Sequence, residues 1–135
     1  MSTSRNLVLA HFWLAFAGFT GALLLGEWQM FVRSPLSSWL RDPELYYRSV
    51  TAHGTAMAYV LPTLVSMGFG YFITEQALGR PLIGRRWAWT GFALTLVGTV
   101  TAVVPVALGL ASVLYTFYPP MIGNAFYYIG IVLVV

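Results

Sequence analysis

His53 is the residue of this chain whose chemistry is hardest to explain as packing alone. It lies in the run YYRSVTAHGTAMAYVLPTLVSMGFGYF, which is apolar enough to belong inside a membrane. A charged side chain at the centre of a membrane helix costs roughly 2.5 kcal/mol or more, and ionisable residues found there are usually functional. A neutral imidazole in an apolar helix has one outstanding use, which is ligation of a metal. His53 is therefore the candidate metal ligand.

A lone membrane histidine has a second use, as a hydrogen-bond partner of a neighbouring helix. Gly54 and Ala56 favour ligation, because small residues leave volume beside the imidazole that a flat macrocycle could occupy. Ser49 lies one turn earlier, and we expect its hydroxyl to accept a hydrogen bond from the second ring nitrogen and so fix the tautomer. Small residues also pack helices against one another, so both interpretations stay open at this point.

Other candidate side chains have simpler explanations. His11 begins the first apolar run, and we expect an interfacial position with its polar edge at the headgroups. Glu27, near the other end of that run, is expected to snorkel, although an acid in a membrane is also a candidate proton site. The methionines are expected to pack rather than to ligate. The sequence shows no phosphate-binding loop, nucleophile–base pair or carboxylate dyad, so we assign no catalytic residue within it.

The composition identifies a membrane protein. Of the 135 residues, 59% are hydrophobic and only 8% are charged, whereas soluble domains are about a quarter charged. There are no cysteines, which excludes disulfides, iron–sulfur clusters and Cys-linked heme within the chain. The net charge of +3 is small and spread over short loops, so it bears on membrane orientation and not on nucleic-acid binding.

Apolar runs of about 20 residues predict the helices that position His53. We expect an all-α integral membrane bundle, with residues 1–135 as a single membrane segment. It would contain three full transmembrane helices and the start of a fourth. The expected runs are Leu7 to about Met30, Pro43 to about Ala77, about Trp87 to Leu110, and a short run from about Ala125 to Val135.

Local signals refine these helices. Asp42, Pro43 and Glu44 form a typical helix start, with an N-cap, a proline in the first turn and an acid beside the helix dipole. Pro62 should kink the second helix and free the carbonyl of Ala58. Two stripes of small residues predict close helix contacts. They are Gly18, Ala22 and Gly26 in the first helix, and Gly91, Thr95, Gly98 and Ala102 in the third.

Arginines in the short loops predict the orientation. The N-terminus and the second loop share Arg5, Arg80, Arg85 and Arg86, whereas the first loop has three arginines. We therefore expect a cytoplasmic N-terminus, which places His53 toward the outer face, roughly 7–8 Å deeper than Arg48 at 1.5 Å per residue. The aromatic and proline-rich segment after the third helix suits an interfacial loop at the same face.

Two stretches resemble the catalytic subunit I of heme–copper terminal oxidases. YYRSVTAHGTAMAYV, at residues 46–60, is similar to the second helix of that family, and VLYTFYPPMIGNAFYYIG, at residues 113–130, is similar to the loop before its fourth helix. Many A-type oxidases have Trp-Thr-Val-Tyr-Pro-Pro in this loop. Tyr115 replaces the Trp here, which resembles the B-type branch of cytochrome c oxidases.

The resemblance implies a cofactor and roles for three residues. His53 would be one axial ligand of the low-spin heme, which is heme b in this branch. Tyr115 and Tyr118 would lie near the heme propionates or the oxygen route. A-type enzymes usually place an arginine in the first helix to meet the formyl group of heme a, and the membrane part of that helix here has none.

A complete subunit of this family has twelve or more helices. Its second axial histidine, the histidine of the high-spin heme, the three copper histidines and their tyrosine follow later in the chain, whereas this sequence has two histidines. We therefore interpret the chain as an N-terminal fragment that offers half of the ligation of one heme. The high-spin heme and copper belong to the full subunit.

The resemblance also implies a function and partners. The full enzyme would reduce oxygen to water with proton translocation in the prokaryotic plasma membrane, fed by cytochrome c or a similar donor. The partners would be the remainder of subunit I and a subunit II with a copper electron-entry site. One alternative is a nitric oxide reductase large subunit, which the YTFYPP loop disfavours. Another is a non-catalytic membrane scaffold or transporter component, in which His53 only packs.

Overall fold

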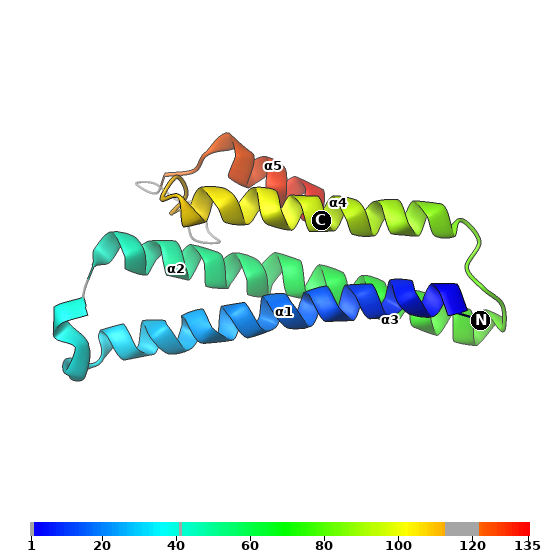
Figure 1. The fold of residues 1–135 in the computed structure, drawn as a ribbon, viewed down its shortest axis with the longest axis horizontal. Coiled ribbons are helices and arrows are strands. Elements are labelled where there is room, and N and C mark those ends of the chain that lie inside the picture. The colour runs from blue at the N-terminus through cyan, green and yellow to red at the C-terminus, as the bar shows by residue number, and fades with distance from the viewer. Residues whose placement is uncertain (1, 41, 113–121) are drawn as a thin grey trace.

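The computed structural model describes the whole chain except residues 1, 41 and 113–121. Figure 1 shows α1 running beside the long helix formed by α2 and α3, with α4 alongside them and α5 packed against α4. The N-terminus of α1 lies at the same end as the α3–α4 loop. The elements are α1 (Ser2–Arg33), the 3-10 segment η1 (Pro35–Leu40), α2 (Pro43–Thr55), the π segment η2 (Ala56–Val60), α3 (Leu61–Leu78), α4 (Arg85–Ala107) and α5 (Ala125–Val134).

The expected membrane helices are confirmed. Three helical stretches are long and apolar enough to cross a bilayer, at Ser4–Arg33, Pro43–Leu78 and Arg85–Ala107. α5 is a shorter apolar helix that begins at Ala125, as expected. The described residues are otherwise free of β-structure except for one isolated antiparallel bridge between Ala111 and Gly123.

The second helix begins and continues for identifiable reasons. Asp42 caps it as predicted, because its carboxylate accepts hydrogen bonds from the amides of Glu44 at 2.9 Å and Leu45 at 3.3 Å. Before Pro62, the helix passes through the π turn η2, in which the amide of Leu61 donates to the carbonyl of Ala56. The wider turn carries the helix past the proline, and α2 and α3 follow one another along one course (Figure 1).

The small-residue stripe of α1 contacts the second helix, as predicted. Ala22 is 1% exposed. A Cβ atom added at Gly18 would lie 3.7 Å from Cγ1 of Val60, which is van der Waals contact with η2. Gly26 faces the ring of His53. Because these residues lack bulk, the backbone of α1 approaches α2 closely enough for direct contact with its side chains.

The stripe of α4 serves mainly to pack α5. Thr95, Gly98 and Ala102 are buried, and a Cβ atom added at Gly98 would lie 2.7 Å from the carbonyl oxygen of Gly130. Gly91, at the start of the stripe, is instead near Met67 of α3. The stripe therefore divides between two neighbouring helices.

Substitution at Gly98 should separate α4 from α5. Gly98→Ala would force a methyl group against a backbone carbonyl that cannot rotate away, and we expect it to destabilise the fold by about 1–3 kcal/mol. Gly70→Ala is the matched control, because nothing lies within 4 Å of a Cβ atom at that helical position. Thermal unfolding in detergent, followed by circular dichroism, measures both; equal midpoints for the two variants would contradict the packing described.

Two polar contacts join α2 to the last two helices. Arg48 donates from Nε to the carbonyl of Val106 at 3.0 Å and from a second nitrogen to the carbonyl of Ala107, so it caps the C-terminal end of α4. The hydroxyl groups of Thr55 and Tyr127 lie 2.7 Å apart in the interior. Both contacts flank His53 along α2 and hold this helix in place.

Candidate functional site

The imidazole of His53 lies between α2 and α1. Its Nδ1 atom is 2.7 Å from the carbonyl oxygen of Ala22. A carbonyl can only accept a hydrogen bond, so Nδ1 must carry the proton and donate it. In the neutral ring, Nε2 then holds the lone pair. No described residue forms a hydrogen bond to Nε2, and the side chain is half-buried.

Gly26 makes this contact possible. A Cβ atom at Gly26 would lie 3.1 Å from Cε1 of His53, 3.4 Å from Nδ1 and 4.0 Å from Nε2. The ring therefore rests against bare helix backbone one turn beyond Ala22, with Nε2 as its most distant nitrogen. A side chain at this position would press against the ring, and the imidazole would have to shift by a few tenths of an ångström.

The expected partner of His53 was wrong. The hydroxyl of Ser49 donates to the carbonyl of Tyr46 at 2.7 Å, within its own helix. A serine inside a helix readily bonds to the carbonyl of the preceding turn. The Nδ1 proton of His53 goes to Ala22 instead of to Ser49. The orienting groups are Ala22 and Gly26 of the facing helix. The small-residue stripe of α1 was the signal that could have identified them.

The donor arrangement fits a metal-bound imidazole. Histidines that bind metals commonly donate their other N–H to a carbonyl or carboxylate, which fixes the tautomer and makes the ligand more basic. The described residues contain no group of three His, Cys, Asp or Glu side chains that could hold an ion. Among these residues, His53 thus offers a single donor, as an axial heme ligand does.

Gln29 carries a buried amide without a hydrogen-bond partner among the described residues. It lies three residues beyond Gly26 in α1, and therefore on the same face of the helix. Its Nε2 atom is buried and has no hydrogen-bond partner among the described residues. Buried donors are normally paired, and the amide of Gln29 is an exception among the described residues.

The ring of His11 is buried between helices, so the prediction that its polar edge reaches the headgroups was wrong. Its side chain is 1% exposed, and Nδ1 bonds to the carbonyl of Leu7 at 2.8 Å. The ring centroid lies 5.4 Å from that of Tyr71 and 4.9 Å from that of Phe92. Gly68 admits it, because a Cβ atom there would come 3.0 Å from Cβ of His11. The ring is thus a packing element between helices.

His11 and the part of α1 that contacts His53 are far apart along this helix. His53 contacts Ala22 and Gly26, whereas His11 lies roughly 16 Å earlier on that helix at 1.5 Å per residue. The other candidate residues do not contribute to the part of the site that the structure describes. Glu27 is exposed. Tyr115 and Tyr118 lie outside the described residues.

A methyl group at position 26 should disturb His53 specifically. Gly26→Ala would place this group 3.1 Å from Cε1, and we expect loss of the bond to Ala22 with destabilisation of about 1 kcal/mol. Gly21→Ala is the control, because its Cβ atom would meet nothing within 4 Å and alanine is the better helix former.

Nitrogen NMR of a histidine-labelled sample, together with thermal unfolding, distinguishes the two variants. The parent and Gly21→Ala should show one fixed tautomer with the proton on Nδ1. Gly26→Ala should show a mixture of tautomers. An unchanged His53 spectrum in Gly26→Ala would contradict the orienting role of α1.

Comparison with known proteins shows which proteins this chain is similar to. The family model described as "Cytochrome C and Quinol oxidase polypeptide I" matches residues 3–135. "Cytochrome c oxidase subunit 1" of Thermus thermophilus is 35% identical over 88 residues, which are 63% of this chain and 15% of that protein. A chain of a heme-copper terminal oxidase dimer, solved by cryo-electron microscopy, superposes with a TM-score of 0.89 at 29% identity. That match covers 99% of this chain and 23% of the solved one.

Proposed function

The chain belongs to the cytochrome c and quinol oxidase polypeptide I family, and we propose that its His53 is an axial ligand of a low-spin heme in a terminal oxidase. The hydrogen bond from Nδ1 of His53 to the carbonyl of Ala22 carries this proposal, because it leaves the lone pair of Nε2 available to bind a metal inside a membrane helix. Family membership supplies the reason to expect heme at such a donor. The match covers both stretches that carry the sequence resemblance.

The residues of this chain would hold and orient the group. When bound, heme supplies one-electron redox chemistry. The Ala22 carbonyl holds the imidazole in one tautomer and raises its basicity, and basic ligands favour the oxidised metal. Gln29 presents a buried amide donor on the same face of α1. The contacts of the His53 ring with Ala22 and Gly26 restrict motion of the ligand, and a site that changes little between oxidation states transfers electrons readily.

The type of heme is part of the proposal. We propose heme b, because the membrane part of α1 has no arginine that could meet a formyl group, and Arg5 and Arg33 lie at the two ends of the helix. The Tyr115 form of the YTFYPP loop supports assignment to the B-type branch. We further propose that Tyr115 and Tyr118 lie near the heme propionates or the oxygen route.

In the full protein, electrons from the low-spin heme would pass to a heme–copper center that reduces oxygen to water with proton translocation. The chain spans 15% and 23% of the two relatives, so the residues of that center would come from outside it. The proposed partners are the remainder of subunit I, a copper-bearing subunit II, and cytochrome c or a similar donor. The proposed location is the prokaryotic plasma membrane, with the N-terminus in the cytoplasm.

Substitution of His53 tests the assignment. In the full-length protein purified from its membrane, His53→Ala should lower the low-spin heme content about tenfold or more, because loss of outer contacts alone costs 10–100-fold in metal affinity. The reduced-minus-oxidised absorption band and a pyridine hemochrome assay measure the amount and the type of heme. A b-type spectrum is expected in the parent protein.

His11→Asn is the matched control for this experiment. It removes the other histidine from the packed ring cluster near Tyr71 and Phe92. We expect lower thermal stability with the low-spin band intact. If His53→Ala keeps this band, or if both variants lose it equally, His53 is a packing residue and the proposal is wrong.

A further inference from the structure

A large pocket opens at the end of the bundle away from His53. Its volume is about 830 Å³, and it lies between the first turns of α1, the last turns of α3 and the loop that leads into α4. Leu9 of α1 lines this pocket. Gly26, which contacts His53, lies roughly 25 Å further along the same helix. The pocket is therefore separate from the proposed heme site.

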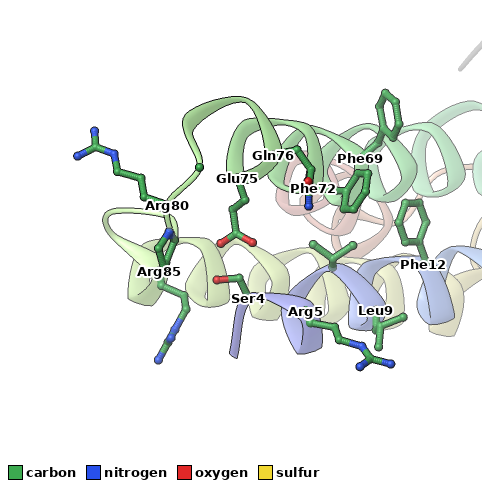
Figure 2. Close-up of a pocket in the computed structure, with 13 residues that line it drawn as sticks. Ser4, Arg5, Leu9, Phe12, Phe69, Phe72, Glu75, Gln76, Arg80 and Arg85 are labelled. Atoms are coloured by element: carbon green, nitrogen blue, oxygen red, sulfur yellow. The ribbon is translucent and has the colours of Figure 1, made fainter. Parts of the chain in front are cut away.

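The pocket is apolar at one end and basic at the other. Figure 2 shows Phe12, Phe69 and Phe72 along the helices, while Arg80 and Arg85 extend from the loop end. Phe72 lies seven residues before Gly79, where α3 ends and the loop with Arg80 begins, so this part of the aromatic lining lies roughly 10 Å from the loop end. This separation matches the distance from the headgroups of a bilayer to its acyl chains.

The charge of the lining is positive. Arg5, Arg80 and Arg85 belong to it, whereas Glu75 is its one acidic residue. The carboxylate of Glu75 already accepts a hydrogen bond from the amide of Leu82 at 3.0 Å, which ties it to the loop. The lining therefore carries three arginines against one carboxylate that is partly occupied within the protein, and the three guanidinium groups extend in different directions around the pocket (Figure 2).

We propose that this pocket binds one anionic phospholipid, with an acyl chain along the phenylalanines and the phosphate at the arginines. The pocket lies at the end of membrane-length helices, where such lipids have their headgroups. Guanidinium groups pair with phosphate through two parallel hydrogen bonds, and basic pockets between transmembrane helices bind anionic headgroups. A zwitterionic lipid would leave the excess positive charge without a partner.

The proposed lipid site and the proposed heme site use different residues of the chain. Neither His53 nor any residue that contacts it lines the pocket. The proposal therefore stands or falls independently of the proposed function, and its experiment needs no heme signal. Helicity measured by circular dichroism serves to confirm folding of each variant.

Native mass spectrometry of the full-length protein, with its associated subunits, tests the proposal. The probes are dioleoyl phosphatidylglycerol and, for comparison, dioleoyl phosphatidylcholine. We expect preferential binding of phosphatidylglycerol. Arg80→Gln combined with Arg85→Gln should weaken this binding about tenfold, because each arginine near an anionic headgroup contributes about 1 kcal/mol before screening.

Arg86→Gln is the matched control. Arg86 neighbours Arg85 in sequence and is exposed, but it does not line the pocket. This variant removes one positive charge from the same region, half the change of the double variant, and we expect it to keep the affinity of the parent protein. Leu9→Trp is a second variant that fills the apolar end without altering charge, and it should also reduce lipid binding.

Four results would overturn the proposal. Equal binding of the two lipids would show that the headgroup charge is not recognised. An equal effect of Arg86→Gln would indicate a diffuse surface charge. Displacement of the lipid by inorganic phosphate alone would show that the apolar end contributes nothing. Unchanged binding in both Leu9→Trp and the double arginine variant would mean that another protein segment occupies the pocket.

Discussion

Close approach of a neighbouring helix to backbone that carries no bulky side chain is the constraint on which the rest of this structure depends. Within a bilayer, hydrophobic burial contributes little to the association of helices, so close packing and hydrogen bonds must drive it. The bond from His53 to Ala22 requires the backbone of α1 to lie within reach of an imidazole on α2. Gly26 satisfies this requirement because it has no side chain. The orientation of the proposed ligand therefore follows from the packing of two helices.

The same rule explains where the other helices meet. Gly68 admits His11 between α1 and α3, and Gly98 admits the backbone of α5. Polar groups then secure the contacts that packing permits. Arg48 joins α2 to the end of α4, and Thr55 meets Tyr127 in the interior. Arg48 and Thr55 each find a partner on a different helix, which makes the relative placement of these helices specific.

The sequence predicted local features better than contacts between helices. The membrane spans, the Asp42 cap and the stripe of α1 were all correct, because each depends on hydropathy or on residues a few positions apart. Ser49 was assigned the wrong partner, and His11 the wrong environment. Both errors concern an imidazole ring that faces another helix, that of His53 in the first case and that of His11 in the second. Helical periodicity specifies which face a residue occupies, but it does not specify which helix covers that face.

Family resemblance and local geometry supply different parts of the site. The resemblance singled out His53 as a ligand, whereas only the structure identifies Ala22 as its partner and Gly26 as the residue that admits it. These two residues look like ordinary packing positions in the sequence. Their contribution is to fix which nitrogen keeps its lone pair, and that choice decides which nitrogen of the imidazole can bind a metal. A stripe that packs helices thus also sets the chemistry of the residue it faces.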